Sequence, residues 1–336
     1  MQPLQLTDSR LSWPGALALQ HTSDWSLPWR VPYPQLDLFP PVELQARLAM
    51  GAGVRLAFLS DTRTVAGAFL SVPEMSPIDL CCNGELIATL PLDGRDTFHF
   101  DNLPAGEKLI ELWLPQFGEF KLRALTIDAG ATLATATDSR PRWITYGSSI
   151  TQCRTAASPT QTWPAIVART CGFNLTCLGF GGQCHLEPML ARLIRDLPAD
   201  YLSMCVGINI YGANSLSPRT FRSAIIGFVQ IVREKHPDTP YVVMSPIYSP
   251  PRETTPNAVD FTLQAMRDEV AAAVDALQAA GDRNLHYVNG LEIFGAEYTH
   301  LLPDELHPDA EGYRIMGHNF VAKVANRYFQ SKTTAN

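Results

Sequence analysis

Three side chains of this 336-residue chain have the types and the spacing of a serine nucleophile with its base. Ser149 comes directly after an apolar run, a glycine and a second serine, at the expected end of a strand. A serine attacks a carbonyl only when a base takes its proton and a carboxylate orients that base. His307 and Asp304 are three residues apart, so the carboxylate can reach the imidazole. The pattern predicts acyl transfer, although the turn alone leaves Ser148 open as the alternative nucleophile.

The same chemistry needs hydrogen-bond donors for the oxyanion that forms when a carbonyl is attacked. The backbone N–H groups of Ser149 and Gly182 and the side-chain amide of Asn209 are donors of the required kind. Each of them follows a separate strand-like run. Taken singly, Gly182 could belong to a tight turn and Asn209 could cap a helix. Their common position after predicted strands favours a single shared site.

The elements that must position these residues alternate between strand-like and helix-like patterns after residue 142. Strands are predicted at 143–147, 174–178, 201–206, 241–244 and 285–288. Helices are predicted at 161–170, 185–196, 220–235, 259–280 and 310–329. Such alternation is typical of a doubly wound parallel sheet with helices on both faces. Sites in these sheets form at the carboxyl ends of the strands, where all the candidate residues fall.

Residues 1–138 have a different pattern, with short apolar runs between turn residues, which predicts a β-sandwich or jelly-roll domain. Asn83 and Gly84 separate two such runs and predict a hairpin, because both positions of a type I′ turn need positive φ. This part also contains Trp13, Trp25, Trp29 and Trp113. Their rings could line a carbohydrate-binding face or fill the core. We predict an accessory domain at 1–138, carbohydrate-binding or pocket-completing, and a catalytic domain at 142–336.

The composition argues against several other classes of function. A net charge of −7 and a pI near 5.6 do not fit a nucleic-acid-binding protein, which needs a basic face. No apolar run approaches the roughly 18 residues of a membrane span, and residues 1–15 lack a signal-peptide pattern. The seven cysteines include no Cys-x-x-Cys pair, which favours reduced thiols over disulfides or a metal site. We expect a cytoplasmic enzyme without metal, cofactor, nucleic-acid partner or membrane partner.

In four blocks the sequence resembles the SGNH (GDSL-type) family of serine esterases and acyltransferases. The blocks are residues 147–151, Gly182, residues 207–209 and residues 304–308, and they stand in the family's order. The resemblance implies a flavodoxin-like α/β fold over about residues 142–330. Some members of the family also carry an N-terminal β-sandwich, among them carbohydrate esterases and natural-product acyltransferases.

The resemblance also implies a role for each candidate residue. Ser149, rather than its neighbour, would be the nucleophile, His307 the base and Asp304 the partner of the base. Gly182 and Asn209 would join the Ser149 backbone as oxyanion donors. None of these positions departs from the family pattern.

Two other positions do depart from that pattern. Ser148 stands where the family usually has an Asp before the nucleophile, and Ile210 stands where it usually has an Asp after the third-block Asn. The first change removes a carboxylate from the turn. Neither change removes a triad or oxyanion residue, so we expect an active enzyme.

The expected activity is that of a serine esterase acting on a short acyl group, such as acetyl, of a sugar-like or small-molecule alcohol. The alternative is an acyltransferase that uses the same triad to acylate a hydroxyl of a small molecule or natural product. A non-catalytic binding protein would have no need of a complete triad. Further candidates for substrate contact lie near the predicted strand ends: Arg154, His185, Tyr211 and Tyr248.

Overall fold

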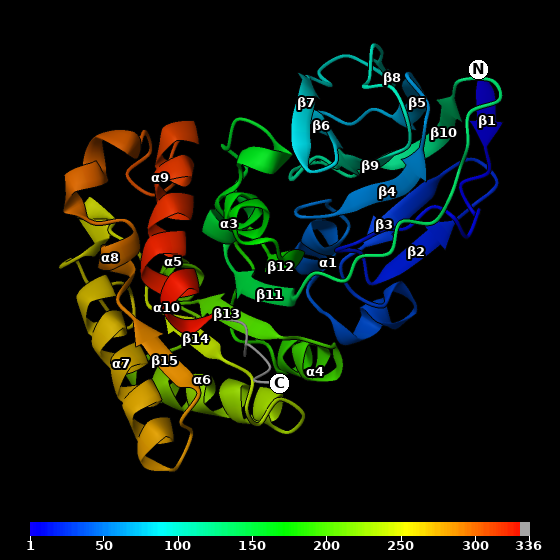
Figure 1. The fold of residues 1–336 in the computed structure, drawn as a ribbon. Coiled ribbons are helices and arrows are strands. Elements are labelled where there is room, and N and C mark those ends of the chain that lie inside the picture. Colours follow the sequence, from blue (N-terminus) through cyan, green and yellow to red (C-terminus); the bar gives the residue numbers. More distant parts are fainter. Residues whose placement is uncertain (330–336) are drawn as a thin grey trace.

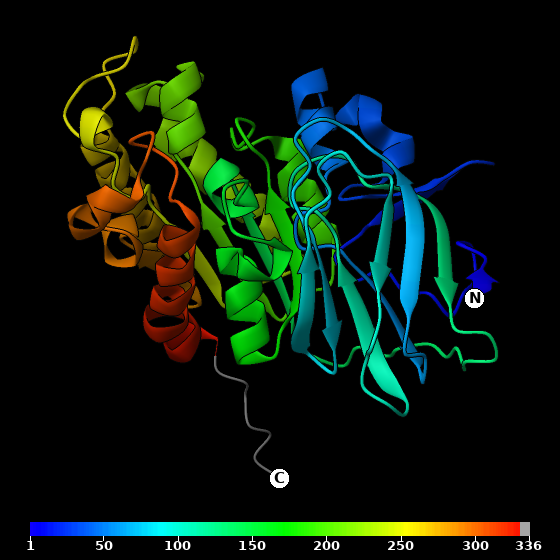
Figure 2. The same cartoon turned by 90° about the horizontal axis from the view of Figure 1, so that it is seen from above.

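The computed structural model describes residues 1–329, which form an N-terminal part (residues 1–138) and a C-terminal part (residues 142–329) (Figure 1). The end of the predicted catalytic domain, residues 330–336, lies outside the described residues. Seen from above, the blue and cyan N-terminal strands stand beside the green elements of the C-terminal part (Figure 2). The two parts therefore pack along one edge of the C-terminal sheet.

The C-terminal part is built on a parallel sheet with the strand order β12-β11-β13-β14-β15. The strands are β11 (Arg142–Gly147), β12 (Asn174–Gly179), β13 (Tyr201–Cys205), β14 (Tyr241–Met244) and β15 (Leu285–Val288). The first two strands of this part, β11 and β12, lie side by side. The later strands β13, β14 and β15 follow one another on the other side of β11. This flavodoxin-like order leaves a crevice at the carboxyl end of β11, where ligands bind in such folds. The predicted α/β fold is thus confirmed.

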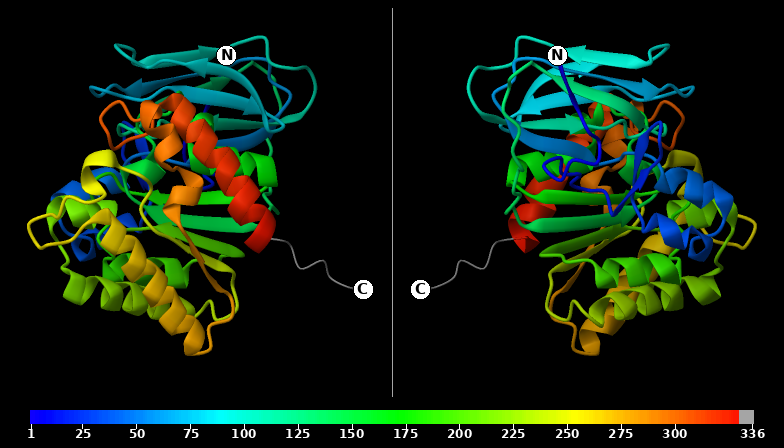
Figure 3. Two further views of the ribbon diagram at one scale, coloured as in Figure 1. Left: turned by 90° about the vertical axis from the view of Figure 1, so that its left-hand side faces the viewer. Right: turned by 90° about the vertical axis from the view of Figure 1, so that its right-hand side faces the viewer.

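Helices cover both faces of this sheet, with α3 and α9 together on one face and α4, α6 and α7 on the other (Figure 1). The longer helices are α3 (Trp163–Cys171), α4 (Pro188–Asp196), α6 (Pro218–Arg233), α7 (Leu263–Ala279) and α9 (Ala310–Phe320). Short turns of helix are α2 (Ser149–Gln152), α5 (Ile208–Ala213), α8 (Gly290–Ile293) and α10 (Asn326–Tyr328), with η2 (Pro159–Gln161), η3 (Pro250–Arg252), η4 (Ala296–Leu301) and the π-helical η5 (Val321–Ala325). Figure 3 shows from two sides that the cyan N-terminal strands and α7 lie on opposite sides of the green strands.

Capping residues explain where two helices begin later than the pattern predicts. The helix expected from residue 161 begins at Trp163, because the Thr162 hydroxyl accepts the N–H of Ala165 and residues before it form η2. The helix expected from residue 259 begins at Leu263, because Thr262 caps it in the same way. A Thr that accepts such a bond fixes the first turn of a helix.

The N-terminal part consists of two packed antiparallel sheets, which confirms the predicted β-sandwich. One sheet has the order β2-β3-β10-β5-β8 with β1 against β10, and the other has the order β4-β9-β6-β7. The strands are β1 (Gln2–Leu4), β2 (Ala18–His21), β3 (Ser26–Trp29), β4 (Arg55–Ser60), β5 (Val65–Leu70), β6 (Ile78–Cys82), β7 (Glu85–Leu90), β8 (Thr97–Phe100), β9 (Lys108–Trp113) and β10 (Lys121–Ile127). The pattern of apolar and turn residues in the sequence did not predict η1 (Tyr33–Leu38) or helix α1 (Val42–Leu48), which lie between β3 and β4.

The predicted hairpin joins β6 to β7, with Asn83 at φ +50° and Gly84 at φ +81°. Both turn residues therefore have the positive φ that a type I′ turn requires. Trp13 and Trp113 are buried in the core, which favours the packing role for these two rings over a carbohydrate-binding face.

Two buried arginines attach the N-terminal part to β12, the edge strand of the parallel sheet. Arg30 donates from Nη1 to the carbonyl oxygens of Cys177 (3.1 Å) and Gly179 (2.8 Å). Arg55 donates from Nη2 to Oδ1 of Asn174 (2.7 Å). Burial lowers the pKa of both guanidinium groups to about 10, so they remain charged near neutral pH. The N-terminal part thus satisfies polar groups that an open sheet edge would leave unpaired.

All seven cysteines are free thiols, as the sequence predicts. None of the helices within residues 1–329 has the length and apolar character that crossing a membrane would require.

Candidate active site

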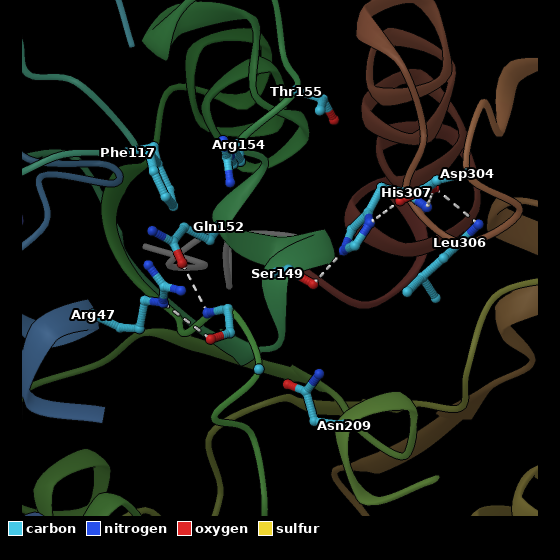
Figure 4. A pocket seen from close by; sticks show the side chains of 12 residues that line it. Arg47, Phe117, Ser149, Gln152, Arg154, Thr155, Asn209, Asp304, Leu306 and His307 are labelled. Atoms are coloured by element: carbon cyan, nitrogen blue, oxygen red, sulfur yellow. Dashed lines mark hydrogen bonds and ion pairs between the residues drawn. The ribbon is translucent and has the colours of Figure 1, made fainter. Parts of the chain in front are cut away.

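Ser149, His307 and Asp304 lie in a row connected by two hydrogen bonds (Figure 4). The Ser149 Oγ atom is 2.8 Å from Nε2 of His307, and Nδ1 of His307 is 2.6 Å from Oδ2 of Asp304. An ionised carboxylate can only accept a hydrogen bond, so Nδ1 of the neutral ring carries the proton. The lone pair of Nε2 then faces the serine hydroxyl. This arrangement is able to remove the serine proton during attack on a carbonyl.

The Asp304 carboxylate is held by its own loop. Its Oδ1 atom accepts the backbone N–H groups of His307 (2.7 Å) and Leu306 (3.1 Å). Partial burial raises the pKa of this carboxyl, but the hydrogen bonds from the His307 ring and from the backbone outweigh it and bring the pKa below its ordinary value. Asp304 is therefore ionised at neutral pH, as a partner for an imidazolium must be.

The turn after β11 distinguishes the two neighbouring serines. Ser148 is buried, and its Oγ accepts the N–H of Ile150 (3.2 Å) as the N-cap of α2. Ser149 is the first residue of α2 and lines the cavity described below, and helix geometry provides no partner for its N–H. A Cβ atom at Gly147 would collide with the side chain of Thr151, so the turn needs a glycine there. The hydroxyl of Ser148 thus performs the capping that an Asp could perform at this position.

Gly182 and Asn209 line the same cavity as Ser149. Oδ1 of Asn209 accepts the N–H of Cys184 (3.1 Å), which fixes the orientation of the amide. Within the described chain, Nδ2 of Asn209 has no hydrogen-bond partner, and the side chain extends toward Ser149 (Figure 4). The next residue, Ile210, is fully buried in the hydrophobic core, so an apolar contact replaces the family's carboxylate.

The cavity has a volume of about 550 Å³ and is lined by residues of both parts. Besides Ser149, Gly182, Asn209, Asp304 and His307, its lining consists of Arg47, Phe117, Gln152, Arg154, Thr155, Gly181 and Leu306. Arg47 and Phe117 come from the N-terminal part, which therefore contributes one wall. Over residues 1–329, no group of three or more His, Cys, Asp or Glu side chains is arranged to hold a metal ion.

Comparison with known proteins places these observations in a family. Residues 141–324, more than half of the chain, match the model of the GDSL-like lipase/acylhydrolase family. The chain belongs to this family. Residues 11–123 match the model of the N-terminal domain of SsfX3, so the N-terminal part of this GDSL-like enzyme has a counterpart in that protein.

Several solved structures resemble this GDSL-like enzyme over both parts. The salicylyl-acyltransferase SsfX3 from a tetracycline biosynthetic pathway is 38% identical, with a TM-score of 0.89 over 97% of each chain. A GDSL-like lipase from Bacteroides ovatus is 21% identical, with a TM-score of 0.75 over 94% of this chain and 97% of the other. A family two carbohydrate esterase from Cellvibrio japonicus is 13% identical, with a TM-score of 0.65 over 97% of each. The last two show a shared fold only. A search of curated proteins gave no match.

Arg154 is the one predicted substrate contact that lines the cavity of this GDSL-like enzyme within the described residues. Its Nη2 forms an ion pair with Glu74 (2.9 Å), and its guanidinium carbon lies 4.2 Å from the centre of the Phe117 ring. Both members of the ion pair are largely exposed to solvent. The guanidinium is therefore free to exchange Glu74 for an anionic group in the cavity.

His185, Tyr211 and Tyr248 lie outside the cavity lining. The side chains of His185 and Tyr211 form hydrogen bonds elsewhere. Nε2 of His185 is 3.0 Å from the carbonyl oxygen of Gly182, and its Nδ1 is 2.7 Å from Oγ of Ser215. The Tyr211 hydroxyl donates to a backbone carbonyl in the loop after η3. His185 thus lies behind the Gly182 turn, where it contacts the backbone.

Proposed function

We propose that this GDSL-like enzyme is an acyltransferase, which forms an acyl-enzyme on Ser149 and passes the acyl group to a hydroxyl of a small molecule. The observation that carries this proposal is the 38% identity to a salicylyl-acyltransferase over 97% of both chains, the N-terminal part included. The sequence alone favoured hydrolysis, with transfer as the alternative, and the comparison supports that alternative better. By analogy, the substrates are small natural-product molecules.

In the proposed first half-reaction, Ser149 Oγ attacks the carbonyl carbon of the acyl donor while Nε2 of His307 takes its proton. The tetrahedral oxyanion accepts hydrogen bonds from the N–H groups of Ser149 and Gly182 and from Nδ2 of Asn209. When the intermediate collapses, the bond to the leaving group breaks and the leaving group takes the proton from His307. Asp304 stabilises the imidazolium that exists between these two proton transfers.

In the second half-reaction, a hydroxyl of the acceptor gives its proton to His307 and its oxygen attacks the acyl-enzyme. Collapse of the second intermediate returns the proton to Ser149 and releases the new ester. Hydrolysis is the second candidate, because water can replace the acceptor at the same atoms. The side chains of His307 and Asp304 are 29% and 54% exposed, so water has access to the triad.

The ratio of transfer to hydrolysis tests this proposal. We expect that adding a hydroxyl acceptor to the enzyme and an activated ester yields the acylated acceptor in excess over free acid. Both products are measured by chromatography, over a panel of acyl groups that includes acetyl and aromatic acyl groups, and of sugar-like and phenolic acceptors. If free acid remains the only product at every acceptor concentration, the enzyme is an esterase and the transfer proposal fails.

The N-terminal part has a proposed role in this reaction. Of the two roles expected for a domain at 1–138, we propose pocket completion, because Arg47 and Phe117 line the cavity. The division into domains at 1–138 and 142–336 stays a prediction.

We further propose that Arg154 binds an anionic or hydroxylated group of the substrate. Replacing Arg154 with methionine is expected to raise KM about tenfold and to change kcat little, since a hydrogen bond to a charged group contributes about 1.5–3 kcal/mol. Steady-state kinetics with a matched pair of anionic and neutral esters measure the effect, which should be larger for the anionic ester. The control is Glu74→Gln, which removes the ion-pair partner but leaves the guanidinium. An equal KM for wild type and Arg154→Met with both esters would contradict the role.

A further inference from the structure

We infer that Arg47, in helix α1 of the N-terminal part, is a positioning residue that orients one donor of the oxyanion hole. Its Nε–H donates to the carbonyl oxygen of Gly181 (3.1 Å). This carbonyl belongs to the same peptide unit as the N–H of Gly182. In a planar trans peptide the C=O and the N–H point in opposite directions. By holding the carbonyl, Arg47 therefore sets the direction of the Gly182 N–H.

This peptide unit needs an external contact because it joins two glycines. Glycine has no Cβ to restrict its backbone dihedral angles, so a peptide between two glycines can rotate at low cost. Gly182 has φ +75°, a left-handed conformation that glycine adopts freely. Without a contact on the carbonyl of Gly181, the N–H would point into the cavity for only part of the time. An oxyanion hole stabilises charge only when its donors are oriented before the reaction.

Within the described residues, the backbone N–H and C=O groups of Gly181 and Gly182 all have hydrogen-bond partners, with a single exception. The N–H of Gly181 donates to Oε1 of Gln152 (2.8 Å), and Nε2 of Gln152 donates to the carbonyl oxygen of Gln116 (3.0 Å). The carbonyl oxygen of Gly182 lies 3.0 Å from Nε2 of His185. The exception is the N–H of Gly182, which has no acceptor in the described part of the chain and belongs to a residue lining the cavity. Among the polar groups of Gly181 and Gly182, the Gly182 N–H is thus the one that stays available to the substrate, beside the Ser149 N–H and Nδ2 of Asn209.

Arg47 also adds positive charge beside this donor. Its guanidinium carbon lies 5.2 Å from the centre of the Phe117 ring, the same ring that Arg154 contacts. Burial lowers the pKa of Arg47, and the charge of the neighbouring Arg154 lowers it further. The two cations are therefore close enough to interact, and this side of the cavity favours negative charge. A cation on the carbonyl of Gly181 also polarises the amide and strengthens its N–H as a donor.

The inference rests on the proposed function, because an oxyanion donor matters only if Ser149 transfers an acyl group. It gives the N-terminal part a role in the chemical step as well as in substrate binding. Two arginines of one cavity then have different roles: Arg47 affects kcat through the Gly181–Gly182 peptide, whereas Arg154 affects KM.

The test compares Arg47→Met, Arg47→Lys and Arg154→Met in the full-length protein with one activated ester. For Arg47→Met we expect kcat to fall about 10- to 100-fold with KM almost unchanged, since removing an oxyanion donor outright costs about 100- to 1000-fold. Arg47→Lys should recover part of the loss, because an ammonium group can donate to the carbonyl of Gly181 but lacks the planar geometry of a guanidinium. Arg154→Met should change KM instead. Glu43→Gln, an exposed change in the same helix, is the control and should match wild type.

Several outcomes would overturn the inference. A wild-type kcat for Arg47→Met, or a change confined to KM, would show that Arg47 does not orient the donor. If Arg47→Met fails to give a cooperative thermal transition, the Lys variant decides: kcat reduced about 3- to 10-fold at constant KM supports the inference, and wild-type kcat refutes it. Failure of the proposed function would look different. If transfer fails, free acid is the only product at every acceptor concentration, and if no acyl-enzyme forms on Ser149, Ser149→Ala keeps its activity in the same assay.

Discussion

Replacing Ser149 with alanine is expected to lower kcat by about 10⁶-fold, the size of effect known for removal of a serine nucleophile. The side chain is the hydroxyl that faces Nε2 of His307, at 2.8 Å. Nearby nucleophilic side chains cannot replace it. Cys153 and Cys184 are buried, and burial raises the pKa of both thiols well above the usual value, so neither forms a thiolate at neutral pH.

The matched control for this prediction is Ser148→Ala in the same turn. It should retain activity within about tenfold and lose about 1 kcal/mol of stability, because the Ser148 hydroxyl caps α2. The measurements are turnover of an activated ester, labelling by a fluorophosphonate probe, and thermal unfolding. Labelling should be lost in Ser149→Ala only, and mass spectrometry of the labelled peptide should locate the probe on Ser149. Wild-type turnover by Ser149→Ala would refute the assignment of the nucleophile.

The sequence predicts the framework of this site well because local patterns determine it. The strands at 241–244 and 285–288 begin and end where expected, since short apolar runs between polar residues have few alternatives in an α/β protein. Parallel strands place their carboxyl ends at one edge, so Ser149, Gly182 and Asn209 had to lie near one another. The structure brings these three residues to one cavity with Asp304 and His307.

The wall from the N-terminal part could not be predicted in the same way. Arg47 contacts Gly181 across a sequence separation of 134 residues, and no local pattern encodes such a contact. The pattern also gave no helix at α1, which carries Arg47. The position of His185 depends on the turn that follows, where Leu186 has φ +63°, a conformation that an apolar side chain does not favour. A pattern of apolar residues carries no information about that turn.

Asp304→Asn is expected to lower kcat by about 10⁴-fold with little change in KM, the effect known when a triad Asp is replaced by Asn. The carboxylate can only accept, so it keeps the proton of His307 on Nδ1 and leaves Nε2 free to take the serine proton. An asparagine NH₂ can donate to Nδ1 instead. The proton of the ring would then reside on Nε2, where it blocks the transfer from Ser149. Steady-state kinetics on the purified variant measure the loss, and Glu305→Gln in the same loop is the control.

The pH dependence of the same pair separates this role from a contribution to folding. The pKa of Asp304 is lowered in the folded protein, so its charge stabilises the fold above the unfolded pKa, and this contribution is lost only as the pH falls through the folded pKa. Kinetics near neutral pH therefore compare an ionised Asp304 with a neutral Asn in two folded proteins. We expect kcat of Asp304→Asn to stay far below that of wild type throughout about pH 6 to 8, because the wild-type carboxyl remains ionised over this range. A ratio of the two kcat values within about tenfold of unity would mean that the hydrogen bond to His307 does not select the tautomer, and the proposed role of Asp304 would be wrong.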